Sequence, residues 1–337
     1  MNNQQNMPPE AVIMQMIIGM RVSRCVSLVA ELGLTDLLAE GSRTVSYLAE
    51  QTGSNEDALN RVLAFLAQQG VYSEVAAGQY ENNLVSDVLG NNHPDSIRSY
   101  VQFLGSNFYW NIVYNLDHAV KTGEPAILRG SDKTTVFDVL QEHPKEQILF
   151  QEAMTKRSKA SGKAIADAYD WAAYDTIVDV GGGQGMLASL IAQRAPSSSV
   201  IYFDLPHVID AANNLLEQNH LPNLQAVGGD FFECVPGPAD LIVMKYIIHD
   251  WDDKKSAQIL TNCKEQLKNG GRILLCEGLM VTDGSKSVAM RSSDINMLLV
   301  GGKERTQQNF ADLAAQVGLK LCRIIDTEGG TYLVELM

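Results

Sequence analysis

Apolar residues in the second half of the chain occur in short runs that alternate with stretches of helical spacing. The run at 176–180 is followed by a glycine cluster, and residues 186–193 then restore an apolar helical pattern, which predicts a strand, a tight turn and a helix. Further strands are predicted at 200–204, 224–230, 241–244, 272–276, 320–325 and 331–336, and helices at 208–219, after Asp252 and at 309–317. Alternating strands and helices predict an α/β fold: a Rossmann-like, doubly wound, mostly parallel sheet closed by a C-terminal antiparallel hairpin.

The first half of the chain is predicted to be mainly helical. Residues 12–29 are apolar on nearly every face, which favours burial against a second subunit over burial in the core of one chain. Residues 46–53 and 55–69 predict a helix-turn-helix, and two short β segments around the turn at 76–78 predict the wing of a winged helix. We expect three regions: a winged-helix-like dimerisation domain at 1–100, a helical, substrate-lining linker at 101–170, and a Rossmann-like catalytic domain at 171–337.

The helix-turn-helix raises the alternative of a DNA-binding regulator. However, the first 100 residues carry five Lys and Arg against eleven Asp and Glu, and the expected recognition helix at 56–63 has two acids and one Arg. Phosphate contacts would need basic side chains there, and the formal net charge of −14 disfavours any surface that follows a phosphate backbone. We therefore predict a packing and dimerisation role for this domain, and no nucleic-acid partner.

Composition indicates a globular protein of the reducing cytosol. At 337 residues and 45% hydrophobic content, the chain suits two or three domains with ample core. Its five cysteines show no C-x-x-C spacing, and the apolar run at 11–20 is too short to span a bilayer. The histidines outside position 249 show no paired ligand spacing, and Asp252 and Asp253 are expected to cap a helix. We predict a cytoplasmic location, no membrane partner and no metal.

The glycine turn and the strand ends are the candidate binding site, because ligands of such sheets bind beyond the carboxyl ends of the strands. Glycines at 181, 183 and 185 allow close backbone approach, but Met186 occupies the sixth position, where the dinucleotide fingerprint needs glycine. Asp204 could accept both hydroxyls of a ribose, unless it only caps a helix. Asp230 could accept from an adenine amine while Phe231 packs on the ring, and Lys245 could reach the ribose or a carboxylate.

Taken together, five motifs resemble those of the caffeate-type, class I small-molecule O-methyltransferases. The resemblance includes bacterial relatives that act on phenazines, polyketides and other aromatic natural products. It covers nearly the whole chain, because these enzymes also carry an N-terminal winged-helix dimerisation domain. The motifs are VDVGGGQG at 178–185, FDLPHVI at 203–209, VGGDF at 227–231, MKYIIHDW at 244–251 and GGKERT at 301–306.

The resemblance implies a homodimer that transfers a methyl group from S-adenosylmethionine (SAM) to a hydroxylated aromatic molecule without a metal. It makes His249 the general base, with Glu277 and Glu304 fixing its tautomer and stabilising the imidazolium. It assigns the cofactor to Ser158, Gly181, Gly183, Asp204, Leu205, Asp230, Phe231 and Lys245. It assigns the acceptor to Phe150, Met154, Asp250 and Met297. The alternative for His249 is a helix-entry histidine bonded to a backbone carbonyl.

One departure concerns the segment before the GGKERT motif. Only Leu298, Leu299 and Val300 separate Met297 from Gly301, which is shorter than the plant pattern and lacks a polar residue before the glycines. We expect this loop to border the acceptor, so a larger or more apolar aromatic than a plant phenylpropanoid is predicted. Methylation of nitrogen or carbon, or loss of methyl transfer altogether, are the alternatives; His249 and both glutamates favour oxygen.

Overall fold

The structure is a computed structural model that describes residues 7–210, 221–281, 284–327 and 329–337. It divides into two compact units. Unit 1 comprises the chain up to Tyr114 together with Leu140–Lys156, and unit 2 comprises Asn115–Val139 and Arg157–Met337. One boundary between the units falls inside a single helix, α10 (Pro144–Asp167).

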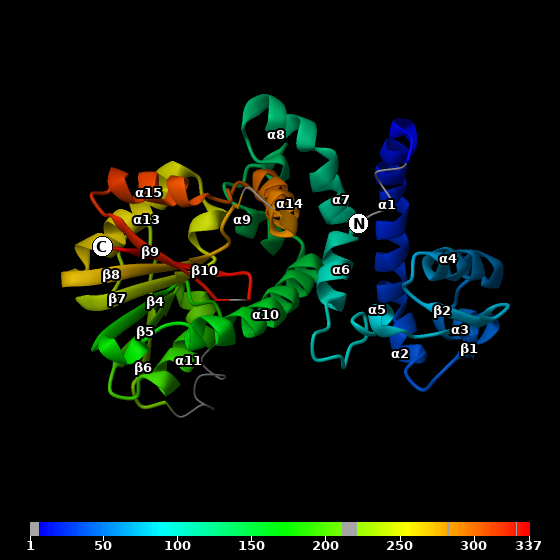
Figure 1. Ribbon diagram of the computed structural model, residues 1–337, viewed down its shortest axis with the longest axis horizontal. Helices are drawn as coiled ribbons and strands as arrows, with labels where there is room; N and C mark the ends of the chain where they lie inside the picture. The colour runs from blue at the N-terminus through cyan, green and yellow to red at the C-terminus, as the bar shows by residue number, and fades with distance from the viewer. Residues whose placement is uncertain (1–6, 211–220, 282–283, 328) are drawn as a thin grey trace. The chain divides into compact units, whose positions relative to one another are not determined.

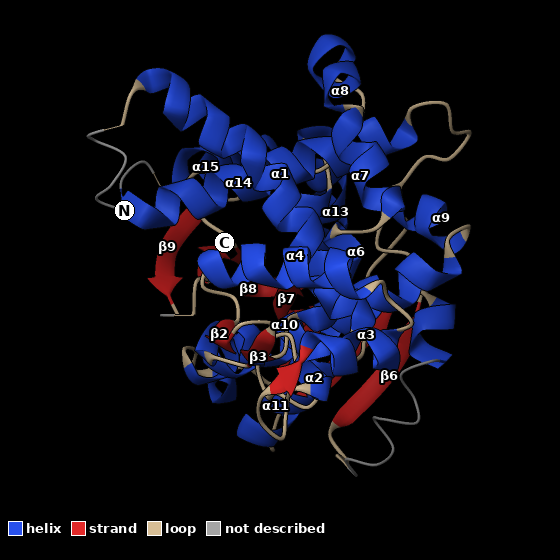
Figure 2. Ribbon diagram, turned by 90° about the vertical axis from the view of Figure 1, so that its right-hand side faces the viewer, coloured by secondary structure: helices blue, strands red, loops and turns tan. Residues whose placement is uncertain are grey.

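Unit 1 contains the predicted helix-turn-helix and hairpin. Thr44 caps α3 by accepting from the Tyr47 N–H, and Asn55 caps α4 by accepting from the Ala58 N–H, so polar residues set both helix starts. A strand that the sequence analysis missed, β1, pairs with β3 and makes a three-stranded sheet in the order β1-β3-β2. Figure 2 labels most of these elements. They are α1 (Pro9–Leu32), α2 (Leu34–Leu37), β1 (Arg43–Thr44), α3 (Val45–Thr52), α4 (Glu56–Gln68), β2 (Ser73–Ala76), β3 (Gln79–Glu81), α5 (Leu84–Asp87), α6 (Arg98–Leu104), α7 (Asn107–Tyr114) and the first part of α10.

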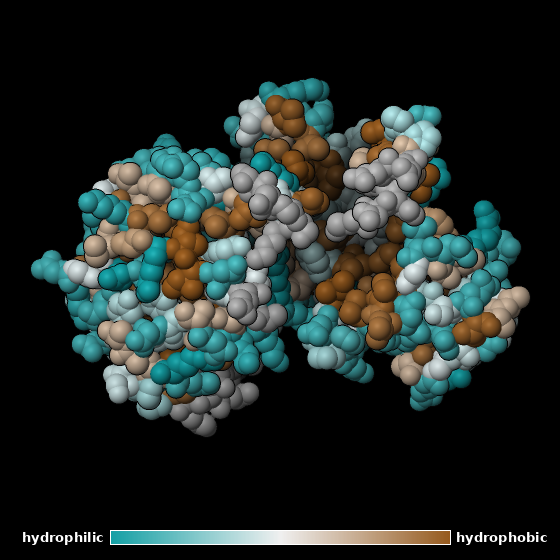
Figure 3. Space-filling model, viewed as in Figure 1, coloured by the Kyte–Doolittle hydropathy of each residue, from teal (hydrophilic) through white to brown (hydrophobic). Residues whose placement is uncertain are grey.

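Helix α1 is apolar and largely uncovered. Only Ser27, Val29 and Ala30 among its residues are buried, and brown, hydrophobic atoms gather over the part of unit 1 that carries it (Figure 3). By length and composition it could cross a membrane, a test that core helices and signal sequences also pass. The apolar segment is therefore longer than the ten residues at 11–20 from which a membrane span was excluded. The exposed apolar residues are Ile13, Met14, Met16, Ile17 and Met20.

Unit 2 contains the predicted α/β sheet. The strand order is β6-β5-β4-β7-β8-β10-β9; the first five strands run parallel, and β10 is antiparallel to both neighbours. The predicted helix at 208–219 lies outside the described residues from position 211 onward. The elements are α8 (Leu116–Thr122), η2 (Ala126–Leu128), most of α9 (Val136–Gln141), η3 (Trp171–Ala173), β4 (Thr176–Val180), α11 (Met186–Arg194), β5 (Ser199–Asp204), β6 (Leu224–Gly228), β7 (Ala239–Lys245), η4 (Ile248–Asp250), α13 (Asp253–Glu265), β8 (Leu267–Glu277), α14 (Gly284–Val300), α15 (Gln307–Gln316), β9 (Leu321–Asp326) and β10 (Tyr332–Leu336).

Alternate residues of the strands face two separate cores. Val178 and Val180 of β4 belong to a core with α13 and α15, whereas Ile177 belongs to a second core with α11. Figure 1 shows α13 and α15 on one side of the sheet and α11 on the other. Helices cover both faces of the sheet. Polar side chains therefore gather at the edge formed by the carboxyl ends of the parallel strands.

Two elements differ from the sequence-based expectation. Strand β8 begins at Leu267 rather than 272, because a bulge opposite Ala239 and Leu241 accommodates extra residues. The segment Leu298, Leu299 and Val300 is not a loop: it is the last turn of α14, a helix missed from the sequence. These apolar residues continue the helix until Gly301, whose φ of 102° ends it.

Candidate active site

The imidazole of His249 lies among three carboxylates. His249 itself is on a 3-10 turn, η4, between β7 and α13. Its Nδ1 is 3.8 Å from Glu277 Oε2 and 3.6 Å from Glu304 Oε1, and its Nε2 is 3.3 Å from Asp250 Oδ1. Burial alone would lower the pKa of His249, but the negative charges of these three groups outweigh burial and raise it to about 9. The ring therefore holds a proton firmly at neutral pH.

Glu277, the last residue of β8, is fully buried and holds the turn directly. Its Oε1 accepts from the Ile247 N–H at 3.1 Å and from the Ile248 N–H at 2.8 Å, while its Oε2 finds no hydrogen-bond partner in the described part of the chain. Burial raises the pKa of Glu277 to about 7. One oxygen thus positions the backbone beside His249, and the other remains available to the ring.

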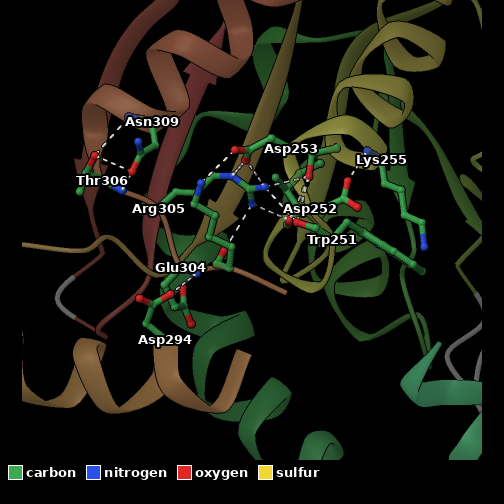
Figure 4. Close-up of polar contacts among 12 residues, drawn as sticks. Trp251, Asp252, Asp253, Lys255, Asp294, Glu304, Arg305, Thr306 and Asn309 are labelled. Atoms are coloured by element: carbon green, nitrogen blue, oxygen red, sulfur yellow. Dashed lines mark hydrogen bonds and ion pairs between the residues drawn. The ribbon is translucent and has the colours of Figure 1, made fainter. Parts of the chain in front are cut away.

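Glu304 approaches the same nitrogen from a different part of the chain. Its Oε1 accepts from the Ser293 hydroxyl at 2.7 Å, and no described residue hydrogen-bonds to its Oε2. Its backbone N–H donates to Asp294 (Figure 4). Burial acts to raise the pKa of Glu304, but interaction with His249 and Ser293 lowers it overall, so this carboxylate stays ionised. On the other side of the ring, burial raises the pKa of Asp250.

This cluster can stabilise a positive imidazole and orient it at once. A neutral His249 surrounded by these acids is a strong proton acceptor, because the proton it gains is held by at least one ionised carboxylate. Among the described residues, the ring nitrogens of His249 lie nearest to carboxylates, so the helix-entry alternative gains no support, and the role of His249 as base stays a prediction.

The glycine turn after β4 is closely packed except where a ligand would approach. A side chain at 181 would meet Ile247 at 2.4 Å and one at 182 would meet Tyr202 at 2.6 Å, whereas one at 183 would meet nothing within 4 Å. Gly183 has a φ of 61°, so its conformation favours glycine although its surroundings are open. The backbone here is therefore exposed toward the strand ends.

Two carboxylates lie around this turn. Asp204, the last residue of β5, accepts from the Gly183 N–H at 2.8 Å and from the Leu205 N–H at 2.7 Å, one bond on each oxygen. Each oxygen keeps a lone pair for a hydroxyl group. Asp179 is buried under the turn, where a Cβ on Gly182 would lie 2.9 Å from its Oδ2. Burial raises its pKa to about 7, against the opposing effects of the Lys245 charge and the Ala188 N–H. A buried carboxylate at the glycine turn fits a cofactor that carries positive charge.

The remaining predicted cofactor residues are also at strand ends. Lys245 ends β7, and its Nζ donates to Ser158 Oγ of α10. Asp230 follows β6 and accepts from the Phe232 N–H at 2.8 Å. The ring of Phe231 lies 3.7 Å from where a Cβ on Gly181 would be, so it borders the glycine turn. Within unit 2 the structure brings together every residue predicted to bind SAM around the ends of β4 to β7.

The predicted acceptor residues divide between the two units. Asp250 and Met297 belong to unit 2, where the Met297 carbonyl accepts from the N–H groups of Gly301 and Gly302 at 2.8 Å each. Phe150 and Met154 lie on the part of α10 that belongs to unit 1, and Phe150 packs against Phe103 with ring centroids 5.4 Å apart. Their role toward an acceptor stays a prediction.

Sequence reasoning missed two residues that contact the His249 turn. Tyr246 has a φ of 55°, alone among the described non-glycine residues in this region of backbone space, and its ring stacks on His249 with centroids 5.5 Å apart. Arg305 is 1% exposed and hydrogen-bonds to the turn. Arg305 lies in the GGKERT motif, so the motif was the available signal, but nothing in the sequence showed which way the guanidinium points.

A metal site and a cavity away from the predicted residues are the remaining candidates. Across the described residues, no group of three or more His, Cys, Asp or Glu is placed to hold a metal ion. A cavity of about 460 Å³ lies in unit 1 and is lined by residues such as Asp36, Glu81 and His93. None of the predicted site residues lines it.

Comparison with known proteins agrees with this geometry. Residues 113–320 match the model of the O-methyltransferase domain, and residues 14–92 match the O-methyltransferase dimerisation domain. The chain is 34% identical to phenazine O-methyltransferase PhzM of Lysobacter antibioticus, over 97% of this chain and 96% of that protein. The structure of the mitomycin 7-O-methyltransferase MmcR superposes with a TM-score of 0.89 at 31% identity, covering 97% of each chain.

A second solved structure contains a cofactor and an aromatic ligand together. The O-methyltransferase NcsB1 from neocarzinostatin biosynthesis, in complex with SAM and 2-hydroxy-5-methyl naphthoic acid, has a TM-score of 0.81 at 29% identity. The alignment covers 94% of this chain and 95% of that one.

Proposed function

The chain belongs to the O-methyltransferase family and uses SAM, and we propose that it methylates a hydroxyl group of an aromatic or polyketide-like small molecule with His249 as general base. One observation carries the proposed chemistry: a single imidazole is enclosed by Glu277, Glu304 and Asp250. The cofactor, when bound, supplies a methyl group that is activated by a sulfonium centre.

The residues of the cluster move and hold one proton. A hydroxyl group attacks poorly until its proton is leaving, and His249 in its neutral form takes that proton at Nε2, the nitrogen not directed at the glutamates. The charge of Glu304 then stabilises the imidazolium, and Glu277 keeps the ring in place through the two backbone N–H groups it accepts. No metal enters this proposal.

The cofactor is held, in this proposal, by the glycine turn and the strand ends. Asp204 takes the ribose hydroxyls, Asp230 and Phe231 take the adenine, and Lys245 with Ser158 takes the remaining polar groups. Gly181, Gly183 and Leu205 provide close backbone approach. Phe150, Met154, Asp250 and Met297 contact the acceptor.

We further propose a cytoplasmic homodimer. Residues 1–100 act in dimerisation, 101–170 in lining the acceptor and 171–337 in catalysis. The exposed apolar residues of α1 and the match to a dimerisation domain support the homodimer. The acidic helix-turn-helix serves packing and not DNA binding, so a salt-sensitive gel shift with duplex DNA would contradict this part of the proposal.

The test is to incubate the purified protein with methyl-labelled SAM and a panel of hydroxylated aromatics, including phenazines and naphthoic acids. We expect a labelled methyl group bound as an ether to the former hydroxyl oxygen of at least one product, identified by mass spectrometry and by loss of the free hydroxyl group. Label on nitrogen or carbon would replace the proposed reaction by one of its alternatives, and no transfer to any acceptor would refute it.

A further inference from the structure

The guanidinium of Arg305 is buried against the turn that carries His249. Its Nη1 donates to the Ile248 carbonyl at 2.7 Å, and its Nη2 donates to the Trp251 carbonyl at 2.9 Å. These carbonyls lie on either side of His249 and Asp250 in the chain, so one planar group holds both ends of η4 (Figure 4). Ser256 Oγ lies 3.1 Å from the same Nη2.

Arg305 also joins this turn to the two elements that supply the glutamates. Its carbonyl accepts from the Met280 N–H at 2.9 Å, and its backbone forms a bridge with Leu279, two residues after Glu277 at the end of β8. Glu304 is its immediate neighbour in the chain. A shift of Arg305 would therefore move His249 relative to both Glu277 and Glu304.

Stability alone does not account for an arginine at this position. Burying a guanidinium is costly, and a buried ion pair is often replaceable by apolar residues without loss of stability. Among the described residues, the carboxylate that pairs with Arg305 is that of Asp253, at 2.8 Å, and its side chain is 47% exposed. What arginine offers is a rigid fork of five donors, which suits the fixing of several carbonyls in one plane.

We propose that Arg305, held by Asp253, is a positioning residue for methyl transfer: it fixes the η4 turn so that the His249 ring stays aligned with its carboxylates and with the acceptor oxygen. This inference rests on the proposed role of His249 as general base. Displacing the ring by about 1 Å can cost on the order of 10²-fold in rate.

Asp253 offers a test that avoids emptying the core. Its Oδ1 accepts from Arg305, and its Oδ2 accepts from the exposed Lys303 Nζ at 2.9 Å. Asp253→Ala removes the carboxylate that pairs with the guanidinium and leaves the Arg305 side chain itself unchanged. Lys303→Met is the matched control. It removes the other cation that binds Asp253, and the Lys303 ammonium donates to Asp253 rather than to the η4 turn. Arg305→Lys keeps the charge but loses the fork.

The four proteins to compare with wild type are Asp253→Ala, Arg305→Lys, Lys303→Met and His249→Ala, each checked for folding by thermal unfolding. We expect Asp253→Ala and Arg305→Lys to lower kcat by about tenfold or more with SAM affinity by calorimetry within about threefold. We also expect their kcat/KM to rise at lower pH than in wild type, as the ring moves away from the glutamates. Lys303→Met should match wild type in all three measurements.

Two results separate failure of this inference from failure of the proposed function. If folded Asp253→Ala keeps the wild-type kcat and pH profile while His249→Ala is inactive, the positioning role is wrong and the base assignment stands. If His249→Ala turns over normally, the base assignment itself fails. Should Arg305→Lys not fold, Asp253→Ala decides alone, since its side chain is half exposed and its loss need not disturb the core.

Discussion

Replacing Glu277 by Gln should shift the pH dependence of catalysis in a defined direction. The change removes one negative charge 3.8 Å from His249 Nδ1 and keeps the shape of the side chain. The amide oxygen can still accept from the Ile247 and Ile248 N–H groups, so the turn should stay in place. The substitution therefore isolates the electrostatic contribution from the positional one.

The size of the shift follows from the geometry. Two full charges about 4 Å apart interact by about 4 kcal/mol at an effective dielectric constant of about 20, which corresponds to about 3 pKa units. That is an upper bound, because burial raises the pKa of Glu277 itself to about 7 and leaves it partly protonated near neutrality. We expect the apparent pKa of the base to fall by at least about 1 unit.

The assay is the pH profile of kcat/KM with one aromatic acceptor used for both proteins, so that ionisation of the acceptor cancels. In wild type the pKa of His249 is raised to about 9, so the imidazole is protonated below that pH and kcat/KM should rise as pH approaches it. In Glu277→Gln the rise should begin at lower pH and reach a lower plateau, since a less basic imidazole is a weaker acceptor. A profile that coincides with wild type, or moves to higher pH, would show that Glu277 does not raise the pKa of His249.

Three further predictions test other parts of the molecule. Burial raises the pKa of Asp179 to about 7, and a cationic cofactor favours its ionised form. SAM binding just below pH 7 should therefore release protons, which calorimetry in buffers of different ionisation enthalpy can measure. Asp179→Asn should abolish that release. Gly182→Ala should weaken SAM binding because its Cβ would meet Tyr202 at 2.6 Å; unchanged affinity would contradict the packing of the turn. Ile17→Arg, at a residue 57% exposed on α1, should convert a dimer to monomer by light scattering, and a persistent dimer would show that α1 is not its interface.

The sheet of unit 2 could be predicted because its signals are local. Most strands contain a short apolar run, and some, such as β5 and β7, end at a polar residue, Asp204 or Lys245, so the sequence indicated both the strands and the edge where they deliver side chains. The resemblance of the motifs then assigned roles to those side chains. The strand order and the division of apolar residues between two cores needed the structure.

Features that depend on distant contacts could not be predicted. The bulge in β8 depends on its pairing with β7, and α14 ends at Gly301 by conformation rather than by composition. Arg305 lies more than 50 residues from the Ile248 and Trp251 carbonyls, and Tyr246, whose φ is positive, contacts Thr331 and His249 through its side chain. The raised pKa of His249 likewise depends on Asp250 at one ring nitrogen and on Glu277 and Glu304 meeting at the other.

Methyl transfer from labelled SAM in His249→Ala, at saturating cofactor, tests whether His249 removes the proton of the acceptor. Calorimetry on the same protein reports whether the cofactor site is intact. We expect SAM affinity within about threefold of wild type and a rate lower by on the order of 10²-fold or more. Transfer at the wild-type rate without the imidazole would show that His249 is not the base.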